Sequence, residues 1–495
     1  MERPDASRRD HFHGDDRGGR GNIPAPADCS RRRGGDWKQF ASVFWSKVPS
    51  NKGKDGEAEM KAIQFGLLLL LLSSLLLPTV PVVAADKLQL TLWHMEARPT
   101  RVKAIEDVVN TFNQQSQDIQ IKVEVQSWGD VYVKAIAAIQ SGKYPDFIFT
   151  TPDFQMNLMA TRIVRPIDDI LTDLQKKYKI YSPALDPFNF DNHYWAAPLY
   201  GMSEVLWYRT DLFEKAGLDP KNPPKTWNQL MAACKQLADK GGLKHPIAVP
   251  GDWHLATIQQ IYPLMVTNKA EHIFDPKGDI IFDNPRTVEA YEFYKKLYDM
   301  SPPGSATWQW DQPIAAFVAG EVAMVIEKGQ YIEQWDLRTK LDPNLMAATP
   351  IPIPDKDGQQ GTAYFSNGIH LLKTDPKIRA AFKRFVEYLY EPNNMARLLT
   401  AAPGLFLPVT VEASTSPVLL ESPTIARHKA KFNLMIDQSR YGKLYGFTRR
   451  PYQPNIGRIM GQNLIAWTAQ RMIFDGLSAE KAVKLGAAKM KEAIE

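Results

Sequence analysis

Aromatic side chains beside carboxylates and amides are the most distinctive chemistry in this sequence. Ten of the twelve tryptophans follow residue 85. Trp93 comes at the end of an alternating apolar stretch and is followed closely by Glu96, and Trp128 ends the next such stretch within QSWGD. Aromatic faces stack on the C–H faces of a sugar ring, while carboxylate and amide groups fix its hydroxyls. The pattern therefore indicates a site for a carbohydrate.

Two further tryptophans stand in polar segments where core packing does not explain them. Trp253 lies in PGDWH, and Trp308 alternates with Trp310 in TWQWDQ. Any single tryptophan is more often part of a core, so each has that competing interpretation. Ligands bind beyond the carboxyl ends of strands in a parallel sheet. We therefore expect at least two of Trp93, Trp128, Trp253 and Trp308 to face a ligand.

Signatures of catalysis are scarce. The sequence contains no G-x-x-x-x-G-K-[ST], no G-x-G-x-x-G, no H-E-x-x-H and no C-x-x-C motif. No two histidines after residue 85 stand at metal-ligand spacing, so we expect neither a metal nor a cofactor. Carboxylates are plentiful, however, and a glycosidase needs only two of them about 5–9 Å apart. A secreted glycan-active enzyme stays open as the alternative, although the adjacent Asp168 and Asp169 are expected to cap a helix.

Alternating strand and helix patterns must position these residues. Segments with strand or helix periodicity follow one another as KLQLTLWHM (87–95), RVKAIEDVVNTFNQQS (101–116), IQIKVEVQSW (119–128), VYVKAIAAIQSGK (131–143) and YPDFIFTTPD (144–153). This order predicts a parallel sheet with right-handed crossovers. Farther along, Thr226 and Ser478 are expected to cap the helices that follow them.

The segment MKAIQFGLLLLLLSSLLLPTVPVVAADK (60–87) has the layout of a secretory signal peptide. Val83-Ala84-Ala85 offers the small side chains that a signal peptidase reads, so we expect residues 60–85 to be removed. An uncleaved anchor is the competing interpretation, but the apolar run 62–77 is shorter than the roughly 20 residues a membrane span needs. Residues 1–59 are rich in Arg, Asp and Gly without a hydrophobic period, which predicts a non-native or disordered leader.

The remaining residues, 86–495, have a nearly balanced charge. They carry 47 Lys and Arg against 45 Asp and Glu, a net charge of +2, whereas the whole chain carries +5. This balance gives no support to a nucleic-acid partner. Cys234 is the one cysteine left in this part of the sequence, so the exported protein must be held by its core. Its length suits about two domains.

Five stretches of the sequence together resemble a known family. They are YPDFIFTTPD, VLWYRTDLFEKAGLDPKNPPKTWNQLMAACKQLADKG, FVAGEVAMVIEKGQYI, NGIHLLK and PGLFLPVT. They resemble the extracellular solute-binding proteins of ABC importers, and the nearest branch is the carbohydrate-binding one that includes maltose-binding protein. The resemblance covers nearly all of residues 87–495. It implies an α/β protein of the type II periplasmic binding protein fold, with two α/β lobes joined by a three-crossing hinge.

The resemblance also implies where the lobes divide and what they do. The chain would cross the hinge near Leu199–Glu204, Tyr364–Gly368 and Gly404–Val409. Lobe 1 would comprise 86–200 plus 367–405, and lobe 2 would comprise 201–366 plus 406–495. The protein would be a periplasmic monomer that binds a carbohydrate between the lobes and delivers it to ABC permease subunits. It would catalyse no reaction and would have no stable membrane insertion after cleavage.

The ligand contacts follow from the resemblance position by position. Asp153 is expected to accept hydroxyl protons, and Tyr331 stands where many relatives place a stacking aromatic, although GQY replaces their G-P-W. The full implied set is Glu96, Trp128, Thr151, Asp153, Tyr331, Asn367, Gly368 and Phe406.

Arg449 and Arg450 are not explained by a neutral sugar. One interpretation is a surface pair. The other is a contact from Arg449 to an anionic ligand such as a sugar phosphate or uronate, since the planar guanidinium suits such groups. A polyol or another small anionic solute therefore stays open as an alternative ligand.

Overall fold

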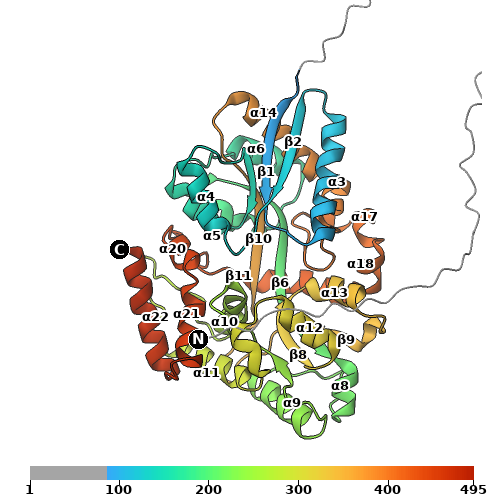
Figure 1. Cartoon of the computed structure of the whole chain (residues 1–495), viewed down its shortest axis with the longest axis vertical. Helices are drawn as coiled ribbons and strands as arrows, with labels where there is room; N and C mark the ends of the chain where they lie inside the picture. Colours follow the sequence, from blue (N-terminus) through green and yellow to red (C-terminus); the bar gives the residue numbers. More distant parts are fainter. Residues whose placement is uncertain (1–85) are drawn as a thin grey trace, which may run out of the picture. The chain divides into compact units, whose positions relative to one another are not determined.

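The first three strands of the computed structural model form a parallel array. The model describes residues 86–495, and the predicted leader and signal peptide lie outside the described residues. Strand β1 (Leu88–His94) pairs in parallel with β2 (Ile119–Val125) and with β3 (Phe147–Thr150). Helices α3 (Pro99–Gln115) and α4 (Val131–Gln140) connect them (Figure 1). The predicted parallel arrangement of these three strands is thus confirmed, within a sheet that also contains antiparallel pairs.

Helix α3 shows why this part of the chain folds as predicted. Pro99 occupies its first turn, where a missing N–H costs no hydrogen bond. Ile105, Val108, Val109 and Phe112 recur at helical spacing and are buried, so that one face of the helix packs on the sheet.

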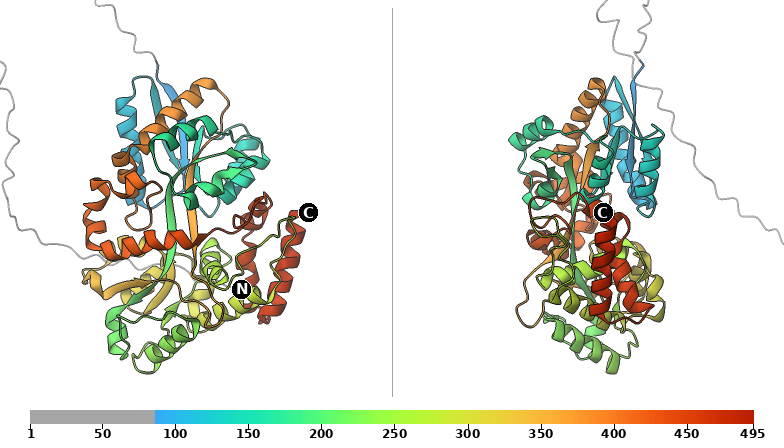
Figure 2. Two further views of the ribbon diagram at one scale, coloured as in Figure 1. Left: turned by 180° about the vertical axis from the view of Figure 1, so that it is seen from behind. Right: turned by 90° about the vertical axis from the view of Figure 1, so that its left-hand side faces the viewer.

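Two long strands carry the sheet from its first half to its second. Six of the first seven residues of β6 (Ala197–Arg209) pair with β10 (Thr362–Leu371), with a register shift that leaves Leu199 unpaired, and β10 also pairs with β3. The last six residues of β6 pair with β8 (Met324–Lys328) and β9 (Met346–Thr349). The sheet order is β2-β1-β3-β10-β6-β8-β7, with β7 at Ile247–Ala248. Figure 2 shows β6 in green and β10 in orange running through both halves.

A third segment joins these strands at one point. Gly201 on β6 lies opposite Ser366 on β10. Its N–H donates to the Leu407 carbonyl at 2.9 Å, and the Leu407 N–H donates back at 2.8 Å. The three segments expected to cross between lobes therefore lie side by side. The exact lobe boundaries stay a prediction.

Helices cover both faces of the sheet (Figure 2). Thr226 and Ser478 accept hydrogen bonds from the Gln229 and Lys481 N–H groups, which confirms both predicted caps. The remaining elements are α5 (Pro152–Ala160), α6 (Asp168–Lys177), α7 (Ser182–Leu185), α8 (Thr210–Lys215), α9 (Trp227–Asp239), α10 (Leu255–Thr267), α11 (Pro285–Tyr298), α12 (Asp311–Ala319), α13 (Gln330–Arg338), α14 (Pro376–Tyr390), α15 (Pro392–Leu399), α16 (Val411–Ser414), α17 (Pro417–Leu420), α18 (Pro423–Arg427), α19 (Lys429–Gln438), α20 (Ile456–Gly461), α21 (Leu464–Ile473), α22 (Ala479–Ile494), β4 (Asn189–Phe190), β5 (His193–Tyr194) and β11 (Gly442–Lys443).

The expected cap by Asp168 and Asp169 is wrong. Both residues lie in the first turn of α6, and Ile167 occupies the cap position without a side-chain bond. Asp168 instead accepts from the Tyr194 N–H and contacts His193, each at 2.8 Å. Asp169 pairs with Arg379. Their charges still favour the helix, because carboxylates near a helix N-terminus complement its dipole.

None of the helices within residues 86–495 combines the length and apolar character that a membrane crossing requires.

Candidate ligand-binding site

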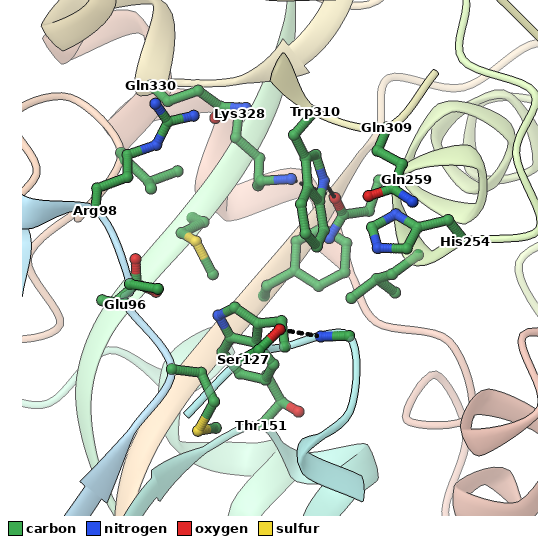
Figure 3. A pocket seen from close by; sticks show the side chains of 18 of the residues that line it. Glu96, Arg98, Ser127, Thr151, His254, Gln259, Gln309, Trp310, Lys328 and Gln330 are labelled. Carbon is green, nitrogen blue, oxygen red and sulfur yellow. Dashed lines mark hydrogen bonds between the residues drawn. The ribbon is translucent and has the colours of Figure 1, made fainter. Parts of the chain in front are cut away.

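A cavity of about 480 Å³ opens between the two halves of the sheet. This volume falls in the range of small-molecule sites, about 300–1,000 Å³. The first half contributes residues that follow β1, β2 and β3, and the second half contributes residues from α10, the 309–311 segment and the end of β8. Figure 3 shows these two walls, with Glu96, Ser127 and Thr151 across from Gln259, Trp310 and Lys328.

The crossing strands form the apolar floor between these walls. Met202 on β6 and Phe365 on β10 are register partners, so their side chains lie on the same face of the sheet. Both line the cavity, together with Leu405 from the third crossing segment and Tyr445.

One wall is organised around Lys328, the last residue of β8. Its Nζ lies 2.9 Å from Glu327 Oε1 and donates to Gln259 Oε1. The same Gln259 oxygen accepts from Trp310 Nε1 at 2.8 Å. Nζ also lies 5.8 Å from the centroid of the Trp310 ring and 5.7 Å from that of Phe365, within cation–π range. The ammonium and the indole are therefore fixed together.

The opposite wall contains a buried ionic bridge. Arg101 on α3 donates through Nη1 to Glu96 Oε2 at 3.0 Å and through Nη2 to Glu333 Oε2 at 2.7 Å. The three side chains are only 6–8 % exposed. Glu333 lies on α13, so Arg101 ties the two halves of the sheet together. Arg98 pairs with Asp311 at the same edge of the cavity.

Asp153 offers a carboxylate beside the aromatic residues of the first half. It is 1 % exposed, and Tyr132 Oη donates to its Oδ2 at 2.6 Å. Burial raises the pKa of the Asp153 carboxyl, and the Tyr132 hydrogen bond opposes that rise. Asp153 Oδ1 is buried and has no hydrogen-bond partner among the described residues.

Glu204 lies beneath this cavity, paired in register with Lys328 and two residues beyond Met202 on β6. It is fully buried, and neither carboxylate oxygen has a hydrogen-bond partner within residues 86–495. Burial raises the pKa of Glu204 well above its ordinary value, with Lys328 opposing the rise and Glu327 adding to it. Burial therefore favours the protonated form of the Glu204 carboxyl.

A raised pKa in the folded state makes stability depend on pH. The contribution of Glu204 is fully present below its unfolded pKa, near 4.5, and is lost as the pH rises through the folded pKa. We expect the free energy of unfolding of the unaltered protein to fall relative to that of Glu204→Gln as the pH rises above the unfolded pKa. Urea unfolding at several pH values measures this difference. The control is Glu321→Gln, at an exposed position, for which the free energy of unfolding plotted against pH should run parallel to that of the wild type. A parallel plot for Glu204→Gln as well would contradict the assignment.

Residues that could chelate a metal do not gather here. Within residues 86–495, no group of three or more His, Cys, Asp or Glu side chains could hold a metal ion.

A family model for the bacterial extracellular solute-binding proteins matches residues 97–396. This match spans more than half of the chain. The chain belongs to the bacterial extracellular solute-binding proteins.

Relatives of this solute-binding protein agree with its fold. An uncharacterised ABC transporter extracellular-binding protein of Pyrococcus horikoshii is 26 % identical over 53 % of this chain, which covers 60 % of that protein. The sn-glycerol-3-phosphate-binding periplasmic protein UgpB of Pectobacterium atrosepticum is 24 % identical, over 63 % of this chain and 71 % of UgpB. An ABC transporter solute-binding protein of Thermotoga lettingae, bound with α-D-tagatose, superposes with a TM-score of 0.67 at 21 % identity, covering 82 % of this chain and all of the other. The predicted type II periplasmic binding protein fold is confirmed.

The sequence located one wall of the site in this solute-binding protein. Glu96, Trp128, Thr151 and Asp153 all line the cavity. Each follows one of the first three strands, which places it at the shared carboxyl edge of the parallel array. That they contact a ligand stays a prediction.

Three predicted tryptophans lie elsewhere. Trp93 is still within β1, where its ring is buried in the core and its Nε1 donates to Glu124 at 2.9 Å. Trp253 is half exposed and donates to the Gln462 carbonyl. Trp308 packs against the main core, and Trp310, two residues on, takes the place in the cavity wall. The expectation of two ligand-facing residues among the four is therefore not met.

The other predicted contacts pack inside the protein or lie on its surface. Tyr331 stacks on Trp207 and is fully buried, so it cannot form the stacking wall that its family position implied. Phe406 stacks on Tyr200 with ring centroids 3.7 Å apart. Asn367 and Gly368 are enclosed within β10, and a Cβ on Gly368 would lie 2.8 Å from the Phe188 ring. Arg449 is exposed and does not line the cavity.

Several lining residues were missed from the sequence. Lys328 ends a strand, and the strand-end rule that selected Trp128 would have found it. Gln259, Tyr445 and Arg101 carry no such signal, because only the packing of distant segments brings them to the cavity.

Proposed function

We propose that this protein is the substrate-binding component of an ABC importer and that it binds a carbohydrate between its two lobes. The observation that carries the proposal is a cavity between the two halves of the sheet whose walls combine Trp128 and Trp310 with carboxylates and amides. The rings suit the C–H faces of a sugar, and Glu96, Asp153 and Gln330 suit its hydroxyls. The tagatose-bound relative supports this class of ligand.

The protein performs no reaction in this proposal. Its lobes, 86–200 plus 367–405 and 201–366 plus 406–495, close on the ligand through the three adjacent crossing segments. A ligand that binds the closed form more tightly than the open form shifts the population toward the closed form. The closed form then docks on the permease subunits. Membership of an extracellular family supports export to the periplasm, with residues 60–85 as the cleaved signal peptide. The exported protein acts as a monomer.

A thermal-shift screen of the purified protein tests this proposal. The panel holds monosaccharides, disaccharides and polyols, with amino acids as the contrasting class. A ligand at 100 times its dissociation constant adds about 2.7 kcal/mol to the free energy of unfolding, which raises the melting temperature by a few degrees. We expect one class of sugar or polyol to do so and to be recovered intact. A response to amino acids alone, or consumption of the sugar, would refute the proposal.

Trp128→Ala and Trp253→Ala form the matched pair of variants for this screen. Losing the cavity-lining ring of Trp128 should weaken binding of the responding sugar about 10- to 100-fold, because the C–H face of the sugar would lose its stacking partner. Trp253 is half exposed and outside the cavity, so its loss should leave the affinity within about twofold. Equal effects of the two changes would remove Trp128 from the site.

A further inference from the structure

We propose that the cavity takes neutral polyhydroxylated ligands and rejects phosphate esters and other anions. This inference rests on the proposed function and names the ligand class more narrowly. It is carried by a pairing of charges: each cation of the cavity wall is already neutralised by a carboxylate of this same chain.

The three cationic side chains that line the cavity, in the described part of the chain, are Arg98, Arg101 and Lys328. Arg98 pairs with Asp311, which is itself part of the wall and also lies 3.7 Å from Arg338. Arg101 is held between Glu96 and Glu333. Lys328 pairs with the fully buried Glu327. None of the three therefore presents an uncompensated positive charge to a ligand.

Displacing the three glutamates among these carboxylates to receive an anion would be costly. Glu96, Glu333 and Glu327 are almost completely buried, and a buried carboxylate that loses its partner costs several kcal/mol. The pairs Arg98–Asp311 and Arg101–Glu333 also join the halves of the sheet. An anion that recruited Arg101 would therefore break the bridge to α13 as well.

The histidine of the wall, His254, does not change this balance. His254 Nδ1 accepts from the Ala256 N–H at 3.2 Å, which an imidazolium cannot do. Burial lowers the pKa of His254, with Asp252 opposing that effect. His254 thus offers a neutral ring and an Nε2–H donor.

Hydroxyl groups, in contrast, fit the wall as it stands. The Lys328 ammonium has three N–H donors. One donates to Gln259 and the ammonium forms an ion pair with Glu327, so a donor is still available for a ligand oxygen. Asp153 Oδ1 and Gln330 Oε1 are acceptors without a partner among the described residues. Donor and acceptor positions without net charge are what a sugar or polyol satisfies.

The arginine pair singled out in the sequence does not supply a free cation to the cavity. Arg449 is exposed and outside the lining. Arg450 donates to Asn189 Oδ1 at 2.9 Å and lies over the Tyr452 ring. The charge-based reason for an anionic ligand at this arginine pair therefore disappears, even though several relatives are named for sn-glycerol 3-phosphate.

Matched pairs of neutral and phosphorylated probes test the inference. Isothermal titration is run with glucose, fructose, ribitol, glycerol and maltose, each beside its monophosphate ester. We expect at least one neutral member to bind and its phosphate to bind about 100-fold more weakly. A phosphate that binds as tightly as its neutral partner, or more tightly, overturns the inference and leaves the proposed function standing. If no member of any pair binds, the proposed function fails and the inference with it.

Asp311→Asn gives a second, independent readout. Freeing Arg98 from its carboxylate should raise the affinity for the phosphate esters about tenfold. The matched control is Asp118→Asn, which removes a carboxylate from an exposed pair with Arg384 outside the cavity and should leave those affinities unchanged. No gain in Asp311→Asn, or an equal gain in Asp118→Asn, overturns the charge-pairing argument.

Discussion

Replacing Arg101 with Met is expected to lower the free energy of unfolding by about 3–5 kcal/mol. The guanidinium is the shared partner of two carboxylates from different halves of the sheet, Glu96 and Glu333. Its removal leaves two buried negative charges without compensation, which costs far more than the pair itself contributes. Urea denaturation followed by tryptophan fluorescence measures the change.

The triple variant Arg101→Met, Glu96→Gln, Glu333→Gln separates charge from packing. The Glu→Gln changes keep the size of both acidic side chains and remove the stranded charges, so we expect the triple variant to regain most of the lost stability. If the single variant is as stable as the wild type, the bridge is not formed in solution. If the triple variant is no better than the single one, the loss comes from packing.

The second large effect is expected from Gly404→Ala. Gly404 has a φ of +88°, a conformation that L side chains rarely adopt, and an added Cβ would lie 2.7 Å from the Gly329 carbonyl oxygen and 2.6 Å from Ile332 Cβ. Backbone strain of about 1–3 kcal/mol and overpacking of about 1–3 kcal/mol act together. We therefore expect a loss of about 2–6 kcal/mol in the free energy of unfolding.

Gly476→Ala is the control for Gly404→Ala. Its φ is +64°, but no atom lies within 4 Å of an added Cβ, so it reports the strain without the clash. We expect the Gly404 variant to be clearly the less stable in thermal and urea unfolding. It should also bind sugar more weakly, because the next residue, Leu405, lines the cavity. Equal losses would mean that the contact between Gly404 and Gly329 relaxes at no cost.

Local patterns in the sequence predicted the parallel strands, and the family resemblance predicted the fold. Glu96, Thr151 and Asp153 were implied by that resemblance, whereas Trp128 was selected because parallel strands end at one edge of a sheet and strand ends can be identified from alternation. The same reasoning failed for Trp93, which lies just before the end of β1 rather than beyond it. It also selected Trp308 in place of Trp310, since the polar segment around them has no periodicity that fixes which ring turns inward.

The opposite wall depends on contacts that no local pattern encodes. Lys328, Gln259 and Trp310 are assembled through hydrogen bonds that span 51 and 69 residues of sequence. The partners of Arg101 are five and 232 residues away. Whether a charged side chain is free for a ligand or already paired is decided by such contacts, and the sequence alone left that question open at Arg449.

The place of β10 in the sheet has a consequence for the order of events during synthesis. β3 ends at Thr150, but the neighbour that covers its free edge, β10, begins at Thr362. The emerging chain must therefore carry an incomplete first half until most of the second half has been made. Such long-range pairing slows folding, because the entropy of closing the intervening loop is lost before the contacts reward it. In the export proposed above, this delay would keep the chain unfolded for longer before it leaves the compartment in which it is made.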